Sequence, residues 1–158
     1  MNGKTLVAYF SASGVTAAAA EKAAEAIGAD LHEITPLQRY TDADLNWMDS
    51  KSRTTLESKN PDCRPALAPT DLDVSSYDTI LLGFPVWWYV EPRIIDTFLE
   101  AGHFAGKTII PFATSSSSQM GNTSELMQKI VPAANVKQGA RFPANVTEEE
   151  LGNWAAQQ

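Results

Sequence analysis

The sequence predicts an α/β fold in which helices cover both faces of a parallel β-sheet, and three observations support this prediction. Strand-like apolar runs alternate with helix-like stretches along most of the chain. The apolar runs are nearly continuous, which is typical of strands buried on both faces. The chain has 158 residues, of which 44% are hydrophobic and 20% charged, so we expect a single domain over residues 1–158.

The first 34 residues predict a strand, a loop, a helix and a second strand. Residues 4–10 form an apolar run that ends at the small residues 11–14. An alanine-rich stretch over 15–27 follows, and Gly28 marks its end because glycine is common just past a helix. Residues 29–34 are then predicted to form a strand.

The middle segment, residues 35–76, is polar and contains four of the nine prolines. A loop of this length without secondary structure is unusual in a compact domain, so we expect a helix within residues 45–58.

The alternation of strands and helices then resumes. The predicted elements are strands over 78–84 and 107–112, an edge strand over 135–140, and helices over 91–100, 123–130 and 147–156. Pro92 suits the first turn of its helix, and Asn122 or Thr123 suits a cap. Thr147 and Glu150 have the spacing of a capping box. Such alternation implies parallel strands with right-handed crossovers, and ligands of these folds bind beyond the carboxyl ends of the strands.

The loop over residues 11–16 favours phosphate binding. It is rich in hydroxyls, carries no charge and opens a helix, whose free N–H groups and dipole bind anions without Lys or Arg. Ser11, Ser13 and Thr16 offer further donors, and Gly14 allows a tight turn. A simple helix cap is the alternative. The loop matches neither GxxxxGK[ST] nor GxGxxG, which disfavours NTPases and dinucleotide-binding enzymes.

Two further loops complete a possible ligand site. Trp87, Trp88 and Tyr89 are consecutive, so they cannot all face the core, and their N–H and O–H groups need partners. A flat aromatic ligand explains them; a hydrophobic lid or a dimer patch is the alternative. Residues 114–122 are small and polar, suited to the polar edge of a heterocycle or simply to a surface loop. Together the loops fit a mononucleotide with a large flat ring, and FMN fits better than ATP because no Mg²⁺ ligand or P-loop Lys is evident.

Charge and composition exclude several classes of function. The net charge of -7 argues against nucleic acid as a partner; it could steer a basic redox partner or simply favour solubility. Cys63 is the only cysteine, and His32 and His103 lack ligand spacing, so no metal site is expected. The apolar runs are far shorter than the roughly 18 residues of a membrane span, and residues 1–4 lead directly into a strand. We therefore expect a cytoplasmic protein without membrane contact.

The three loops resemble those of the flavodoxin family. The first loop is similar to the flavodoxin phosphate loop. The stretch from Gly83 to Trp88 with Pro92 after it, the segment over 107–115 and the late Trp154 are similar to small bacterial flavodoxin-like proteins. The resemblance covers nearly the whole chain. It implies a flavodoxin-like three-layer fold with a five-stranded parallel sheet in order 2-1-3-4-5 and one non-covalent FMN at its carboxyl edge.

The resemblance also implies which residues bind FMN. The phosphate would be held by Ser11, Ala12, Ser13, Gly14, Val15 and Thr16. The ring and ribityl chain would be lined by Pro85, Val86, Trp87, Trp88 and Tyr89. The ring would be bordered on its other side by Thr114, Ser115, Ser116, Ser117 and Gly121. No catalytic residue is predicted; we interpret Glu91 as an acid in the first turn of a helix rather than as a proton donor.

One departure from the family bears on function. Electron-shuttle flavodoxins usually carry an aromatic residue on the third loop, whereas this loop has only small polar residues. One flavin face would then be open or be covered by another segment or subunit. Residues 40–47 are a candidate cover, although we favour packing of Trp47 in the core. The leading hypothesis is an electron carrier with a redox partner protein. An open face resembles NAD(P)H-dependent quinone or flavin reductases, in which a quinone or nicotinamide stacks there, and a third possibility is a binding module without flavin.

Overall fold

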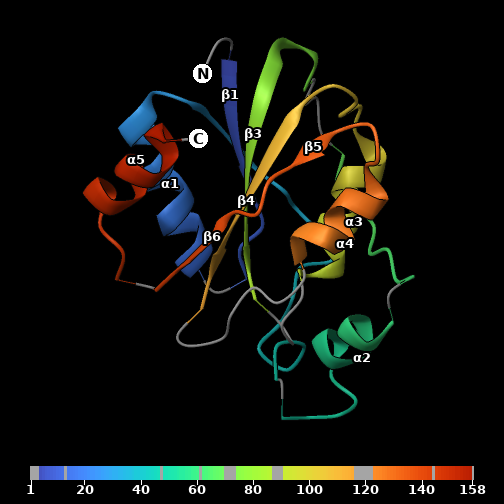
Figure 1. The fold of residues 1–158 in the computed structure, drawn as a ribbon. Coiled ribbons are helices and arrows are strands. Elements are labelled where there is room, and N and C mark those ends of the chain that lie inside the picture. The colour runs from blue at the N-terminus through green and yellow to red at the C-terminus, as the bar shows by residue number, and fades with distance from the viewer. Residues whose placement is uncertain are drawn as a thin grey trace.

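A parallel sheet forms the centre of the protein in the computed structural model, which describes residues 4–12, 14–46, 48–60, 62–69, 74–86, 91–115, 123–143 and 145–157. The strand order is β2-β1-β3-β4-β5, with β6 also paired to β4 (Figure 1). The strands are β1 (Lys4–Tyr9), β2 (Asp30–Glu33), β3 (Tyr77–Pro85), β4 (Thr108–Thr114), β5 (Asn135–Val136) and β6 (Ala140–Phe142). All pairings are parallel. The predicted fold class and the order 2-1-3-4-5 are confirmed.

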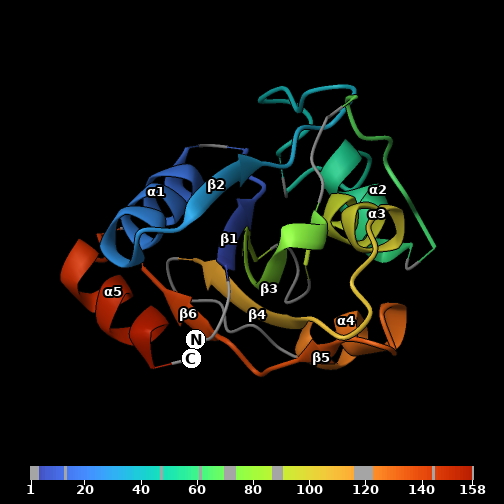
Figure 2. The same ribbon diagram turned by 90° about the horizontal axis from the view of Figure 1, so that it is seen from above.

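Helices cover both faces of the sheet (Figure 2). Helices α1 (Val15–Ile27) and α5 (Glu148–Ala156) lie on one face, and α3 (Arg93–Ala101) and α4 (Thr123–Ile130) on the other. The central strands therefore bury side chains on both sides, as their apolar sequences predicted. None of the helices in the described ranges is long and apolar enough to cross a membrane.

The edge strand predicted over 135–140 is divided into β5 and β6, and Pro111 explains the division. The carbonyls of Lys107 and Ile109 accept hydrogen bonds from the edge segment, so alternate residues of β4 face that edge. Pro111 faces the same way but has no N–H to offer. Opposite it, Gly139 has φ +70°, a left-handed conformation that breaks the strand between the two short pairings.

The helix predicted within 45–58 is α2 (Arg53–Lys59), which extends one residue past that range. Its start is fixed by Ser52, whose side chain accepts a hydrogen bond from the Thr55 N–H. An antiparallel bridge between Pro36 and Leu67 joins the segment before α2 to the segment after it. In α5, Thr147 is the N-cap and accepts from the Glu150 N–H, which confirms the predicted cap. The predicted cap Asn122 lies outside the described residues.

Candidate functional site

The start of α1 has features that favour anion binding at a helix N-terminus. Gly14 is the N-cap residue in a left-handed conformation (φ +95°), and no side chain caps the helix. The first turn carries no acidic residue. The first N–H groups of a helix have no partner within it, and the positive end of the helix dipole lies beside them. Among the described residues, no atom lies within 4 Å of a Cβ added at Gly14.

The hydroxyl of Thr16 joins this turn to the end of β4. Thr16 is 1% exposed, and its Oγ1 lies 2.7 Å from Oγ1 of Thr114. The hydroxyl that the sequence offers to a phosphate thus lies in hydrogen-bond contact with Thr114, and either of the two oxygens can be the donor. The Ser11 Oγ likewise accepts a hydrogen bond from the Gly14 N–H at 3.0 Å. The Ser11 hydroxyl keeps its own proton to donate, and both contacts fix the shape of the main chain at the start of α1.

A double-mutant cycle tests the threonine pair. We expect Thr16→Val and Thr114→Val each to lower the free energy of unfolding by about 1–3 kcal/mol, since each leaves one buried hydroxyl without its partner. The double variant should cost less than the sum of the two, because it removes both polar groups together. Urea unfolding of the four proteins measures this; strictly additive losses would contradict a direct bond.

The other two predicted site loops follow β3 and β4. The residues just before these loops lie at the same edge of the sheet as the start of α1. Pro85 ends β3, and the Val86 N–H donates to the Thr114 carbonyl at 3.2 Å. Phe10, which follows β1, donates its N–H to the Gly83 carbonyl at 3.0 Å. The structure therefore brings together the following predicted site residues: Ser11, Ala12, Gly14, Val15, Thr16, Pro85, Val86, Thr114 and Ser115. The other predicted residues lie outside the described part of the chain: Ser13, Trp87, Trp88, Tyr89, Ser116, Ser117 and Gly121.

Sequence reasoning missed Arg141, which is fixed at this edge of the sheet. Its Nε donates to the Ser115 Oγ at 2.9 Å, and a terminal nitrogen donates to the Ser115 carbonyl at 3.1 Å. The Ser115 N–H in turn donates to the Phe142 carbonyl at 3.2 Å. Arg141 belongs to β6, whose separate pairing with β4 was not predicted. The only signal in the sequence was a basic residue in a short strand-like stretch.

The α2 segment extends beyond the same edge of the sheet (Figure 1). The ring of Tyr40 makes an edge contact with Phe10, with ring centroids 5.5 Å apart. The Tyr40 hydroxyl donates to Glu57 at 2.5 Å, and the Arg53 guanidinium lies 3.8 Å from the Tyr40 ring centre. Burial, followed by the hydrogen bond to Glu57, raises the pKa of Tyr40. Tyr40, predicted to belong to a possible flavin cover, is thus fixed beside the end of β1, while Trp47 lies outside the described residues.

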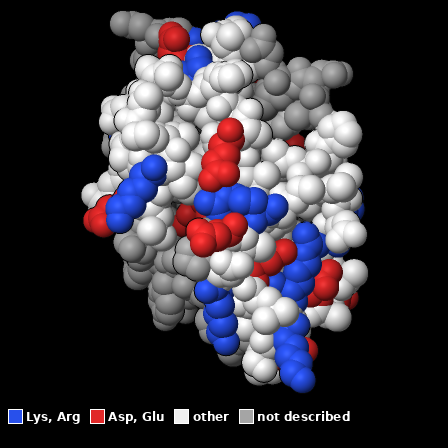
Figure 3. Space-filling model, turned by 90° about the vertical axis from the view of Figure 1, so that its right-hand side faces the viewer, with Lys and Arg blue, Asp and Glu red and all other residues white. Residues whose placement is uncertain are grey.

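The surface around α2 and α3 carries charges of both signs (Figure 3). Arg53 pairs with Glu57 at 2.8 Å, and Arg64 pairs with Glu100 at 2.8 Å. In the parts of the chain that the structure describes, no cluster of His, Cys, Asp and Glu could hold a metal ion.

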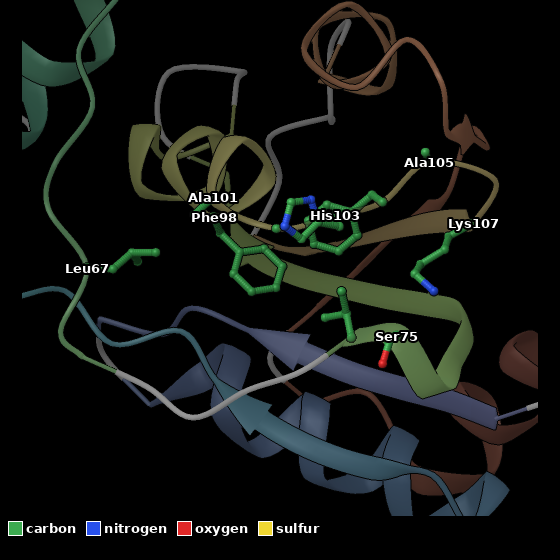
Figure 4. A pocket seen from close by; sticks show the side chains of 10 residues that line it. Leu67, Ser75, Phe98, Ala101, His103, Ala105 and Lys107 are labelled. Atoms are coloured by element: carbon green, nitrogen blue, oxygen red, sulfur yellow. The ribbon is translucent and has the colours of Figure 1, made fainter.

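A pocket of about 370 Å³ lies at the opposite end of β3 and β4 (Figure 4). Its wall includes Ser75, just before β3, and Lys107, just before β4, together with the apolar side chains of Leu67 and Phe98. Because it opens at the amino ends of these strands, it is separate from the edge that carries the loops.

Comparisons with known proteins agree with this geometry. The sequence profile of the flavodoxin family matches residues 4–158. A candidate flavoprotein from Bacteroides uniformis is 46% identical, with a TM-score of 0.92 and 99% of each chain covered. Another from Bacteroides eggerthii is 42% identical, with a TM-score of 0.89, covering 99% of this chain and 98% of that one.

More distant structures share the fold alone. A flavoprotein from Lactobacillus acidophilus, crystallised in complex with FMN, is 24% identical with a TM-score of 0.70, covering 97% of this chain and 99% of that one. None of the curated proteins matches the chain significantly. The profile match over nearly the whole chain and the sheet order both lead to one assignment: this chain belongs to the flavodoxin family.

Proposed function

We propose that this protein binds one FMN non-covalently at the carboxyl edge of its sheet and carries electrons through it. FMN is the cofactor that flavodoxin family membership implies, and the Lactobacillus acidophilus structure contains it. The observation that carries the proposal is the start of α1, which has no side-chain cap and no acidic residue in its first turn, and where no described atom lies within 4 Å of a Cβ added at Gly14. These are the properties that a phosphate monoester requires of a helix N-terminus.

We assign the phosphate to the loop over residues 11–16, with main-chain N–H groups as its chief donors. The ring would lie between the loop that follows Val86 and the loop that follows Thr114. The Val86–Thr114 hydrogen bond and the Thr16–Thr114 contact hold the starts of these loops and the first turn of α1 together. The remaining predicted residues of all three loops stay part of this proposal.

When bound, FMN supplies the redox chemistry, and the protein sets its environment. The main chain at the start of α1 binds and orients the phosphate. The Arg141 guanidinium, held on Ser115, brings a positive charge to the start of the loop after β4. We propose that this positive charge stabilises the additional negative charge of the flavin ring when it is reduced. The proposal further includes a single domain, a cytoplasmic location and a redox partner protein.

An absorbance spectrum of the purified protein after addition of FMN and gel filtration tests the proposal. We expect a flavin spectrum at about one FMN per chain, and reduction by a flavodoxin reductase. A protein that stays colourless after incubation with FMN would instead be a binding module without flavin, which would refute the proposal.

The same sample distinguishes a carrier from an NAD(P)H-dependent quinone or flavin reductase. The loop over residues 114–122 contains no aromatic side chain, an observation that favours an open flavin face and hence the reductase. Steady oxidation of NADH or NADPH by the protein and a quinone alone would establish the reductase. Reduction only in the presence of the partner reductase would establish the carrier.

A further inference from the structure

Glu91 and Asp96 form a buried carboxyl pair at the start of α3. Glu91 is 0% exposed and Asp96 is 1% exposed. The N-cap of α3 is Pro92, so Glu91 directly precedes the cap and is not in the first turn, contrary to the prediction from sequence. Asp96 is the fourth residue of the helix. Apolar residues at these two positions often pack together as a staple that fixes the angle at which the chain enters a helix.

The contacts of the pair indicate that it holds one proton. Among the described residues, no donor reaches either carboxyl oxygen of Glu91 or the Oδ1 of Asp96. Two buried carboxylates in contact would repel each other strongly. Burial, and then the Asp96 side chain, raise the pKa of Glu91 to about 9. A protonated Glu91 that donates to the Asp96 carboxylate removes the repulsion and gives a partner to one oxygen of each side chain.

Asp96 is the member that keeps its negative charge, because two arginines face it. Guanidinium nitrogens of Arg93 and Arg64 lie 3.5 Å and 3.7 Å from its Oδ2. Burial raises the pKa of Asp96, but the hydrogen bond from Glu91 and both arginines oppose that rise.

Other titratable groups surround this pair. Arg64 also pairs with Glu100, and burial raises the pKa of the neighbouring Cys63 thiol. From α2, the facing groups are main-chain carbonyls: Arg93 donates to those of Glu57 at 3.3 Å and Ser58 at 2.8 Å. Among the described residues, two arginines form ion pairs with Asp96, and the partly exposed Glu100 pairs with one of them.

The Glu91–Asp96 pair lies at the point where the loop after β3 enters α3. Val86 is fixed before that loop by its bond to the Thr114 carbonyl, and Glu91 is fixed after it by burial at the entry to α3. We infer that Glu91 and Asp96 act as a proton-dependent staple that positions the end of this loop for FMN, an inference that rests on the proposed function. Glu91 is thus a positioning residue. Loss of the shared proton sets two negative charges against each other and disturbs the entry to α3.

The direction of the pH effect follows from the raised pKa. Above the ordinary range of a carboxyl group, the folded protein retains a proton that the unfolded chain releases, so the contribution to stability falls as pH rises towards about 9. Near and above that pH the folded protein itself loses the proton. FMN affinity should therefore weaken in the same range.

The test is the dissociation constant of FMN, measured by quenching of flavin fluorescence from pH 7 to pH 10. We expect the affinity of the natural protein to fall by up to about tenfold above pH 9. Glu91→Gln should abolish this fall, because its amide donates to Asp96 at every pH. Glu100→Gln makes the same substitution near the other end of α3, at a side chain that is 49% exposed, and should follow the natural protein. The flavin's own ring proton affects all three proteins alike.

The outcomes separate this inference from the proposed function. Parallel pH profiles of the natural protein and Glu91→Gln, both binding FMN at pH 7, would overturn the staple alone. No FMN binding by any of the proteins at pH 7 would overturn the proposed function and the role of the staple with it. Circular dichroism at each pH verifies folding. If Glu91→Gln does not fold, Asp96→Asn takes its place, because an amide at that position removes the carboxyl–carboxylate repulsion and should also flatten the profile.

Discussion

Val15→Glu should weaken FMN binding by at least about tenfold while leaving the protein as stable as before or slightly more so. Val15 is the first residue of α1 and is 36% exposed. An acidic side chain there places a negative charge beside the proposed phosphate position. The same charge stabilises the helix by interaction with its dipole, by about 0.3–1 kcal/mol. Affinity and stability are therefore expected to change in opposite directions, which a general disruption of the fold cannot produce.

Val15→Gln is the matched control, since it has nearly the same size and shape as the glutamate variant but no charge. FMN titration and urea unfolding of the three proteins measure the effect. The difference in affinity between Glu and Gln should shrink as salt is added, because salt screens the repulsion. Equal affinities of the two variants at low salt would mean that the phosphate does not lie at the start of α1.

Gly139→Ala should lower the free energy of unfolding by at least about 3 kcal/mol. Gly139 has φ +70°, and an added Cβ would collide with the main-chain carbonyl of Pro111. The clash involves the backbone of a central strand, which cannot move aside as a side chain would. Strain and collision therefore add at this position.

Gly106→Ala separates the two contributions. Gly106 has φ +79°, but a Cβ there would meet no atom within 4 Å. We expect it to cost about 1–2 kcal/mol, the penalty of a left-handed conformation alone. Chemical unfolding of both variants gives the comparison, and a loss at Gly139 no larger than that at Gly106 would contradict the close approach to Pro111.

The order of the elements could be predicted from the sequence because the signals are local. The continuous apolar run over residues 4–10, the alanine-rich helix that Gly28 ends and the Thr147 cap each depend on a few neighbouring residues. The division of the edge strand depends instead on Pro111 meeting Gly139, a contact between residues that are distant in sequence. Periodicity within a single stretch contains no information about such a contact.

The candidate site shows the same division between local and long-range signals. The loop at the start of α1 was recognisable because glycine and hydroxyl residues before a helix have a direct physical reason to bind anions. Arg141 and the engaged hydroxyl of Thr16 were not recognisable, since each depends on a partner about 26 or 98 positions away. Glu91 was misinterpreted because α3 begins only after Pro92, and because the complete burial of Glu91 is a tertiary feature that the local sequence does not contain.

The divided edge strand also affects how the protein behaves at high concentration. Exposed strand edges allow one chain to extend the sheet of another, and short strands limit this. On this side of the sheet, β5 has two residues and β6 has three, and between them lies Gly139 in a left-handed conformation. A neighbouring chain would find too few consecutive backbone groups there to pair with, so Pro111 and Gly139 also protect the folded protein against aggregation through this edge.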